Sequence, residues 1–152
     1  MVHDFQLAGQ RTRLWQRLGE SYEHILMKAL GYAMFVREFP DLEIETKVGL
    51  RYKPDLVSRG ENNKFVFWGE AGENATRKTL WLLKHARVER LVLFKIATSE
   101  TQFIKQLREE IPQKYRLDGR LILINFVSNI KDLTRERQIE KVSRDWFGKF
   151  EI

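Results

Sequence analysis

Residues 52–78 read YKPDLVSRGENNKFVFWGEAGENATRK, and this pattern predicts two strands followed by the start of a helix. Segments 52–58 and 64–70 are rich in apolar residues, and the run RGENN between them is typical of a turn. Each segment carries one acidic residue, Asp55 or Glu70, where burial of an uncompensated charge is costly. These two carboxylates need a cation or hydrogen bonds, which makes them the first candidates for a functional site.

The flanking segments alternate between helical and strand patterns. Apolar residues at three- and four-residue steps indicate helices, whereas an alternation of period two or a short apolar run indicates strands. The predicted elements are a helix over 11–36, a strand over 42–50, a helix over 74–87, a strand over 90–97, a helix over 99–110, a strand over 121–127 and a helix over 131–147. This order predicts an α/β fold with a mixed central sheet flanked by helices on both sides.

Length and composition limit the possible function classes. A chain of 152 residues with 43% hydrophobic content can bury a core, and we expect a single domain over 1–152. The absence of cysteine excludes a disulfide framework, a thiolate zinc site and a cysteine nucleophile. The net charge of +6 and the pI near 9.6 favour attraction of a polyanion such as DNA or RNA.

No membrane or export segment is recognisable in the sequence. Residues 1–10 lack the apolar core of a signal peptide, and no stretch reaches the roughly 20 apolar residues that span a bilayer. We therefore expect a soluble, cytoplasmic protein that makes no membrane contact.

Asp55 and Glu70 have the chemistry of a divalent-metal site. If their strands are adjacent in a hairpin, the two carboxylates come close enough to share one ion. Carboxylate oxygens, completed by waters and a substrate phosphate, form the hard octahedral environment that Mg²⁺ or Mn²⁺ takes. The pair therefore predicts a Mg²⁺ or Mn²⁺ cofactor.

The helix that follows Glu70 carries two basic residues in its first turns. On an ideal helix Lys78 lies about 60° from the sheet-facing stripe, and Arg77 lies about 160° from it. Lys78 can lean toward Glu70 and stabilise charge on phosphate oxygens or orient an attacking water. Arg77 is better placed for a phosphate outside the pocket, and Lys53 beside Asp55 is a second candidate for nucleic-acid contact.

The first predicted helix can add a third acid to the site. Glu23 borders its apolar surface and is the preferred additional metal ligand, with Glu20 in reserve because a bend at Gly19 would rotate it. Two histidines, His24 and His85, have no second ligand at metal-binding spacing, so structural roles are favoured for both.

Simpler interpretations exist for each of these residues. Asp55 after a proline is compatible with a turn residue, and Glu70 is compatible with an acid that a helix N-terminus favours. Lys78 and Arg77 are equally compatible with a solvated helix face, and an acid such as Glu23 most often pairs with a lysine on the surface.

Pro54-Asp55 on one strand and Glu70-x-Gly72 at the end of the next resemble the PD-(D/E)XK nuclease superfamily. More narrowly, the segment ESYEH at 20–24 and the segment EAG at 70–72, followed by Arg77-Lys78, resemble the bacterial YaeQ proteins. The likeness is good over residues 20–97. It implies a restriction-endonuclease-like αβββαβ core and a metal-dependent nuclease site.

The sequence departs from the superfamily pattern at one position, because Gly72 stands where a lysine is expected. Some superfamily members carry this lysine on the next helix, and by similarity Lys78 takes its role. The resemblance then implies a metal-dependent nuclease that hydrolyses phosphodiester bonds in DNA or RNA with Asp55, Glu70, Lys78 and Glu23. The alternative is a catalytically inactive domain of this fold that binds nucleic acid or a protein partner. The resemblance also allows a homodimer.

Overall fold

The computed structural model describes all 152 residues and contains nine strands and four α-helices in two sheets. The strands are β1 (Val2–Leu7), β2 (Gln10–Trp15), β3 (Glu43–Ile44), β4 (Leu56–Arg59), β5 (Phe65–Ala71), β6 (Leu91–Lys95), β7 (Leu121–Phe126), β8 (Gln138–Ile139) and β9 (Phe147–Glu151). The helices are α1 (Tyr22–Phe35), α2 (Thr76–Lys84), α3 (Thr101–Glu110) and α4 (Ile130–Leu133).

The larger sheet is mixed and has the strand order β3-β4-β5-β6-β7-β9. Strands β5, β6 and β7 are parallel, whereas β3, β4 and β9 run antiparallel to their neighbours. The parallel strands β6 and β7 read LVLFK and LILINF, and their near-continuous burial suits strands that are covered on both faces. The α/β fold with a mixed sheet is therefore confirmed, and the predicted element order from α1 to β7 is observed.

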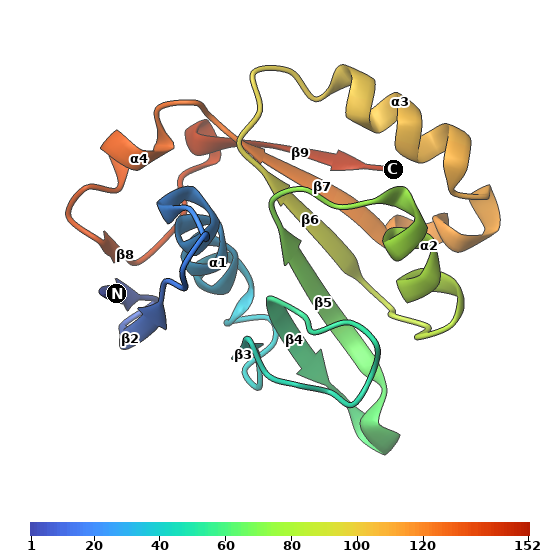
Figure 1. Ribbon diagram of the computed structural model, residues 1–152, viewed down its shortest axis with the longest axis horizontal. Coiled ribbons are helices and arrows are strands. Elements are labelled where there is room, and N and C mark those ends of the chain that lie inside the picture. The colour runs from blue at the N-terminus through green and yellow to red at the C-terminus, as the bar shows by residue number, and fades with distance from the viewer.

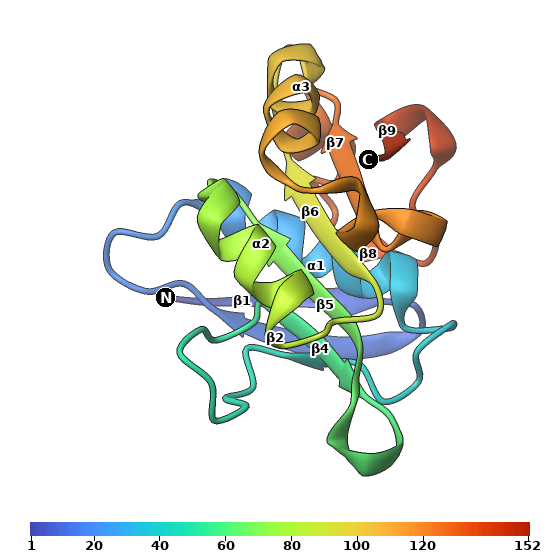
Figure 2. The ribbon, with the colours of Figure 1, turned by 90° about the vertical axis from the view of Figure 1, so that its right-hand side faces the viewer.

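Helices cover both faces of this sheet, α1 one face and α2 with α3 the other (Figures 1 and 2). Each face has its own buried apolar cluster, so side chains that alternate along a central strand enter different clusters. On β5, Phe67 packs on the α1 side and Trp68 on the α2 side. Glu70 has the same parity as Trp68 and therefore starts from the α2 face.

The amino-terminal segment is a β-hairpin, so the predicted helical start at residue 11 is wrong. β1 and β2 pair antiparallel around a two-residue turn, Ala8-Gly9, in which both residues have positive φ. Burial of His3, Phe5 and Leu7 alternates with exposure along β1. The first helix begins only at Tyr22, after the cap residue Ser21, whose hydroxyl accepts a hydrogen bond from the backbone N–H of His24.

The carboxy-terminal segment is also different from the predicted helix over 131–147. The helix α4 ends at Leu133, and Arg137 adopts a left-handed conformation that an α-helix cannot contain. The next strand, β8, pairs with β1 in the small sheet. The chain then returns to the large sheet as β9, which is antiparallel to β7. Pairing with two separate sheets outweighs the weak helical pattern of this charged stretch.

The strand predicted over 42–50 is reduced to β3, because Glu45 takes a positive φ and ends the pairing with β4. The remainder of that segment is a loop that leads to Asp55. None of the helices has both the length and the apolar character that a bilayer-spanning segment needs.

Candidate functional site

Asp55 and Glu70 are neighbours at one end of the β4–β5 hairpin. Asp55 immediately precedes β4, and its backbone N–H donates to the carbonyl of Gly69 at 3.2 Å. Its Oδ2 accepts a hydrogen bond from the backbone N–H of Ala71 at 2.8 Å. The side chain of Asp55 thus lies at the edge of β5, next to Glu70, as the hairpin prediction requires.

Glu70 is buried and receives two donors on the same oxygen. The indole Nε1 of Trp68 donates to Oε1 at 2.8 Å, and the ammonium of Lys78 lies 3.0 Å from Oε1. Burial, and then repulsion from Asp55, raise the pKa of Glu70 to about 7, although Lys78 and the Trp68 hydrogen bond act in the opposite direction. The anionic form of Glu70 is therefore disfavoured and would gain from an additional cation.

Each acid leaves one oxygen free. Asp55 uses Oδ2 for Ala71 and for a 3.4 Å contact with Nε2 of His24, and Glu70 uses Oε1. The other oxygens, Oδ1 and Oε2, have no hydrogen-bond or ion-pair partner in the chain. Such oxygens are available as ligands.

A row of charged residues lies behind Asp55 and begins with His24. The ring of His24 contacts Asp55 through Nε2 and Glu20 through Nδ1, the latter at 2.5 Å. The hydrogen bond to Asp55 raises the pKa of His24, and this effect exceeds the opposite effect of burial. The fully buried Lys28 lies 2.7 Å from Glu20 and 2.5 Å from Glu45. His24 and Lys28 are thus part of the site, although their types and spacing in the sequence do not indicate it.

Glu20, and not the preferred Glu23, lies beside Asp55. Glu20 precedes the helix cap and reaches His24 and Lys28 beside Asp55. Glu23 instead forms an ion pair with Lys131 at 3.1 Å and lines a separate cavity. The structure therefore brings together Asp55, Glu70, Lys78 and Glu20, and it does not bring Glu23 to them.

Of the two residues expected to contact nucleic acid, Lys53 lies beside Asp55 and Arg77 lies on the surface of α2. Lys53 lines a cavity of about 400 Å³ together with Arg17, Glu20 and Asp55. Arg77 is exposed on α2, one residue before Lys78. Both positions are open to a phosphate that approaches from solvent.

Two carboxylates with free oxygens are too few for a metal that needs several protein side chains. No group of three His, Asp or Glu side chains surrounds a common point. Mg²⁺, however, is commonly held by one or two carboxylates, and it keeps several waters. The carbonyl of Ala71 adds a third oxygen. The N–H and C=O of a strand residue point to the same side of the strand. Because the N–H of Ala71 points to Asp55, its carbonyl points to the same side. Asp55 Oδ1, Glu70 Oε2 and the Ala71 carbonyl are the atoms that would hold the ion.

No protein-family model and no curated protein matches the sequence. Among solved structures, the chain is similar to the YaeQ protein from Xanthomonas axonopodis pv. citri, with 18% identity, a TM-score of 0.67, and coverage of 90% of this chain and 81% of that one. It is also similar to the YaeQ protein from Pseudomonas syringae, with 12% identity, a TM-score of 0.64, and coverage of 97% and 91%. The resemblance to YaeQ proteins inferred from the sequence is thus confirmed at the level of the fold.

Proposed function

We propose that this protein is a divalent-metal-dependent phosphodiesterase of the PD-(D/E)XK type that acts on DNA or RNA. The proposal rests on one observation. The adjacent acids Asp55 and Glu70 each have a free oxygen, and the Lys78 ammonium lies 3.0 Å from the other oxygen of the buried Glu70, Oε1. Two carboxylates that repel each other are costly without a cation between them. A Mg²⁺ or Mn²⁺ ion supplies that cation.

Each residue has a separate role in this proposal. The ion, when bound, polarises the scissile phosphate and lowers the pKa of a water. Asp55 and Glu70 hold the ion, and Lys78 shares its charge between Glu70 and the phosphate oxygens. Glu23 was expected as the additional metal ligand; in its place Glu20 acts as a positioning residue, because it contacts His24, which lies 3.4 Å from Asp55. The hydrogen bond from the Ala71 N–H and the contact with His24 both hold Oδ2 of Asp55 and leave Oδ1 free.

The order of elements supports the same assignment. From α1 to β6 the chain follows α, β, β, β, α, β, which is the order of the restriction-endonuclease-like core. Gly72 stands where that pattern has a lysine. Lys78 of α2 supplies an ammonium group to the Glu70 carboxylate instead. The net charge of +6 and the basic residues Lys53 and Arg77 favour a polyanionic substrate.

The test combines metal titration with a nuclease assay. Calorimetric titration with Mn²⁺ is expected to give one site in the wild type and none in Asp55→Asn or Glu70→Gln. Cleavage of single- and double-stranded DNA and RNA is expected to require Mg²⁺ or Mn²⁺ and to fall at least about 100-fold in Lys78→Met, the usual size of the loss when one preorganised charge is removed.

Two control variants match these changes. Asp41→Asn removes an exposed acid, and Lys84→Met removes an exposed lysine from α2, the helix that carries Lys78. Both are expected to retain metal binding and cleavage. Metal binding that is unchanged in Asp55→Asn, or cleavage that persists in the absence of any divalent ion, would contradict the proposal.

A second candidate function is a nucleic-acid-binding domain of the same fold without turnover. Gly72 favours it, because the superfamily lysine is absent and Lys78 is engaged by Glu70. In that case Glu70→Gln is expected to bind nucleic acid as tightly as the wild type, and the wild type is expected to cleave none of the four substrates.

A further inference from the structure

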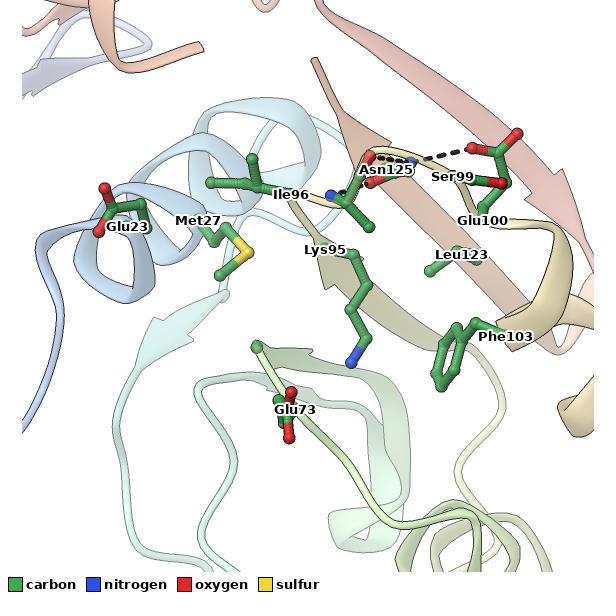
Figure 3. Close-up of a pocket in the computed structure, with 12 residues that line it drawn as sticks. Glu23, Met27, Glu73, Lys95, Ile96, Ser99, Glu100, Phe103, Leu123 and Asn125 are labelled. Atoms are coloured by element: carbon green, nitrogen blue, oxygen red, sulfur yellow. Dashed lines mark hydrogen bonds between the residues drawn. The ribbon is translucent and has the colours of Figure 1, made fainter. Parts of the chain in front are cut away.

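A second cavity, of about 360 Å³, opens beside the ends of β5, β6 and β7. Figure 3 shows its lining, with Met27 of α1 on one side and Phe103 of α3 on the other. In open α/β sheets, the carboxyl ends of the parallel strands are the usual place for ligands. Gly72, two residues after Glu70 in the chain, is one of the residues that line the cavity.

Two charged residues of this cavity have no hydrogen-bond or ion-pair partner in the protein. Lys95 is half-buried, and no carboxylate lies within 4.0 Å of its ammonium, which instead lies over the ring of Phe103, 4.5 Å from the ring centroid. Burial lowers the pKa of Lys95, and the nearby charge of Glu73 only partly offsets this effect. The carboxylate of Glu73 likewise has no hydrogen-bond or ion-pair partner. Figure 3 shows the Lys95 side chain extending toward Glu73.

The other polar groups on this side of the cavity are satisfied. Asn125 accepts from the backbone N–H of Ala97, and its amide donates to the carbonyl of Ala97 and to Glu100. A ligand would therefore meet one free set of N–H donors, on Lys95, and one free carboxylate, on Glu73. The remaining walls include the apolar side chains of Met27, Phe103 and Leu123.

Guanine has the edge that matches this arrangement. Its N1–H and N2–H₂ groups are adjacent donors, which the two oxygens of one carboxylate accept, and its O6 is an acceptor beside them for an ammonium. Apolar and aromatic walls suit the faces of a planar base. The volume is sufficient for a single base. The N1–H, N2–H₂ and O6 groups are the ones that pair with cytosine in a duplex, so the base has to be unpaired or extruded from a helix.

We propose that this cavity binds one unpaired guanine of the nucleic-acid substrate, with Glu73 accepting from its N1–H and N2–H₂ groups and Lys95 donating to O6. The inference rests on the proposed function, because the bound nucleotide belongs to the strand whose phosphodiester lies at Asp55 and Glu70. It assigns the substrate class as single-stranded or locally unpaired nucleic acid that contains guanine.

The test measures binding of GMP, AMP, CMP and UMP in EDTA, by NMR shifts or calorimetry, so that no metal contributes. GMP is expected to bind at least tenfold more tightly than the other three, because only guanine offers two adjacent donors to Glu73 beside an acceptor for Lys95, whereas uracil offers a single N–H beside its acceptor. Lys95→Met and Glu73→Gln are each expected to weaken GMP binding about tenfold or more, the effect of losing one base-edge interaction. Both variants should fold, since neither side chain has a hydrogen bond or an ion pair to lose, and a methionine at position 95 can still pack against the ring of Phe103.

Lys105→Met on α3, an exposed residue, is the matched control and should bind GMP as the wild type does. Equal affinity for the four nucleotides, or unchanged GMP binding in both variants, would overturn the guanine assignment. Asp55→Asn separates the two proposals, because it should lose cleavage and keep GMP binding. Cleavage without guanine preference would refute the pocket alone, whereas GMP binding without cleavage would refute the hydrolase alone.

Discussion

Lys28 is the most deeply buried charged residue of the protein, with 0% exposure. Burial alone lowers the pKa of Lys28, but the hydrogen bonds that its ammonium donates to Glu20 and Glu45, together with the charges of these carboxylates, outweigh burial and leave the pKa raised. The ammonium thus stays charged and fixes Glu20, which in turn contacts His24 beside Asp55. A residue of the helix interior thereby determines how the first acid of the site is oriented.

Replacement of Lys28 by methionine is expected to lower the free energy of unfolding by about 3 kcal/mol, because it leaves two partly buried carboxylates without their cation. Urea denaturation at pH 7 measures the change. The triple variant Lys28→Met, Glu20→Gln, Glu45→Gln should recover most of the loss, since it removes the uncompensated charges. A Lys28→Met variant as stable as the wild type would show that the three charges are not coupled.

At the same scale, the sequence predicts the site only where local geometry is sufficient. Asp55, Glu70 and Lys78 are linked by one hairpin and one helical turn, so strand pairing and helix periodicity predict their proximity. The choice between Glu23 and Glu20 depended on a helix starting at residue 11, but α1 starts at Tyr22 and Glu20 lies before it. Helical angles cannot be assigned to a residue outside the helix, and this is why the preference was reversed.

At the scale of elements, α1 lies unusually close to the sheet at Gly31. A Cβ atom at this position would lie 2.8 Å from Leu56 Cδ1 of β4 and 2.8 Å from Phe94 Cζ of β6. Gly69 of β5 makes a similarly close approach to the same two side chains. These glycines let the helix that carries His24 and Lys28 approach the strands that carry Asp55 and Glu70.

Gly31→Ala is expected to destabilise the protein by up to about 2 kcal/mol, because overpacking exceeds the roughly 1 kcal/mol that alanine gains in helix propensity. Thermal or urea unfolding measures the difference. Phe94→Leu removes the ring atoms that the new methyl group would meet, so the double variant should lose less than the sum of the two single losses. Strict additivity would mean that the close approach is not the cause.

The elements themselves were predictable where one pattern extends over several turns or a whole buried strand. β6 and β7 are apolar runs, and α2 and α3 have clear helical faces, so their types and order follow from the sequence. The β1–β2 hairpin was hidden because Leu14 and Leu18 continue the spacing of α1 backward into the strand and the loop. β8 and β9 pair with strands more than 20 residues away in the chain, and no local pattern reveals such partners.

At the scale of the whole molecule, the site makes stability depend on pH. Glu70 has a pKa of about 7 in the folded protein and an ordinary value of 4.5 when unfolded. The folded state thus binds more protons between these values, and stability falls as pH rises from 4.5 through 7. The raised pKa of His24 acts in the same direction above its usual 6.5. The lowered pKa values of Asp4, Glu20 and Glu23 act only below about 4.5, so they do not oppose this trend at neutral pH.

The wild type is therefore expected to lose about 2 kcal/mol of unfolding free energy between pH 5 and pH 8, and Glu70→Gln is expected to lose much less. Urea denaturation at both pH values measures the two differences, with Glu109→Gln as a control for the loss of an exposed acid on α3.

Mg²⁺ should restore stability to the wild type at pH 8, where Glu70 is ionised, by about 2.7 kcal/mol at a hundredfold excess over its dissociation constant. It should have little effect at pH 5, because the ion must there displace the Glu70 proton, and none on Glu70→Gln at either pH. A pH dependence that is the same in Glu70→Gln as in the wild type would show that this carboxyl titrates normally, and the electrostatic case for a cation between Asp55 and Glu70 would fail with it.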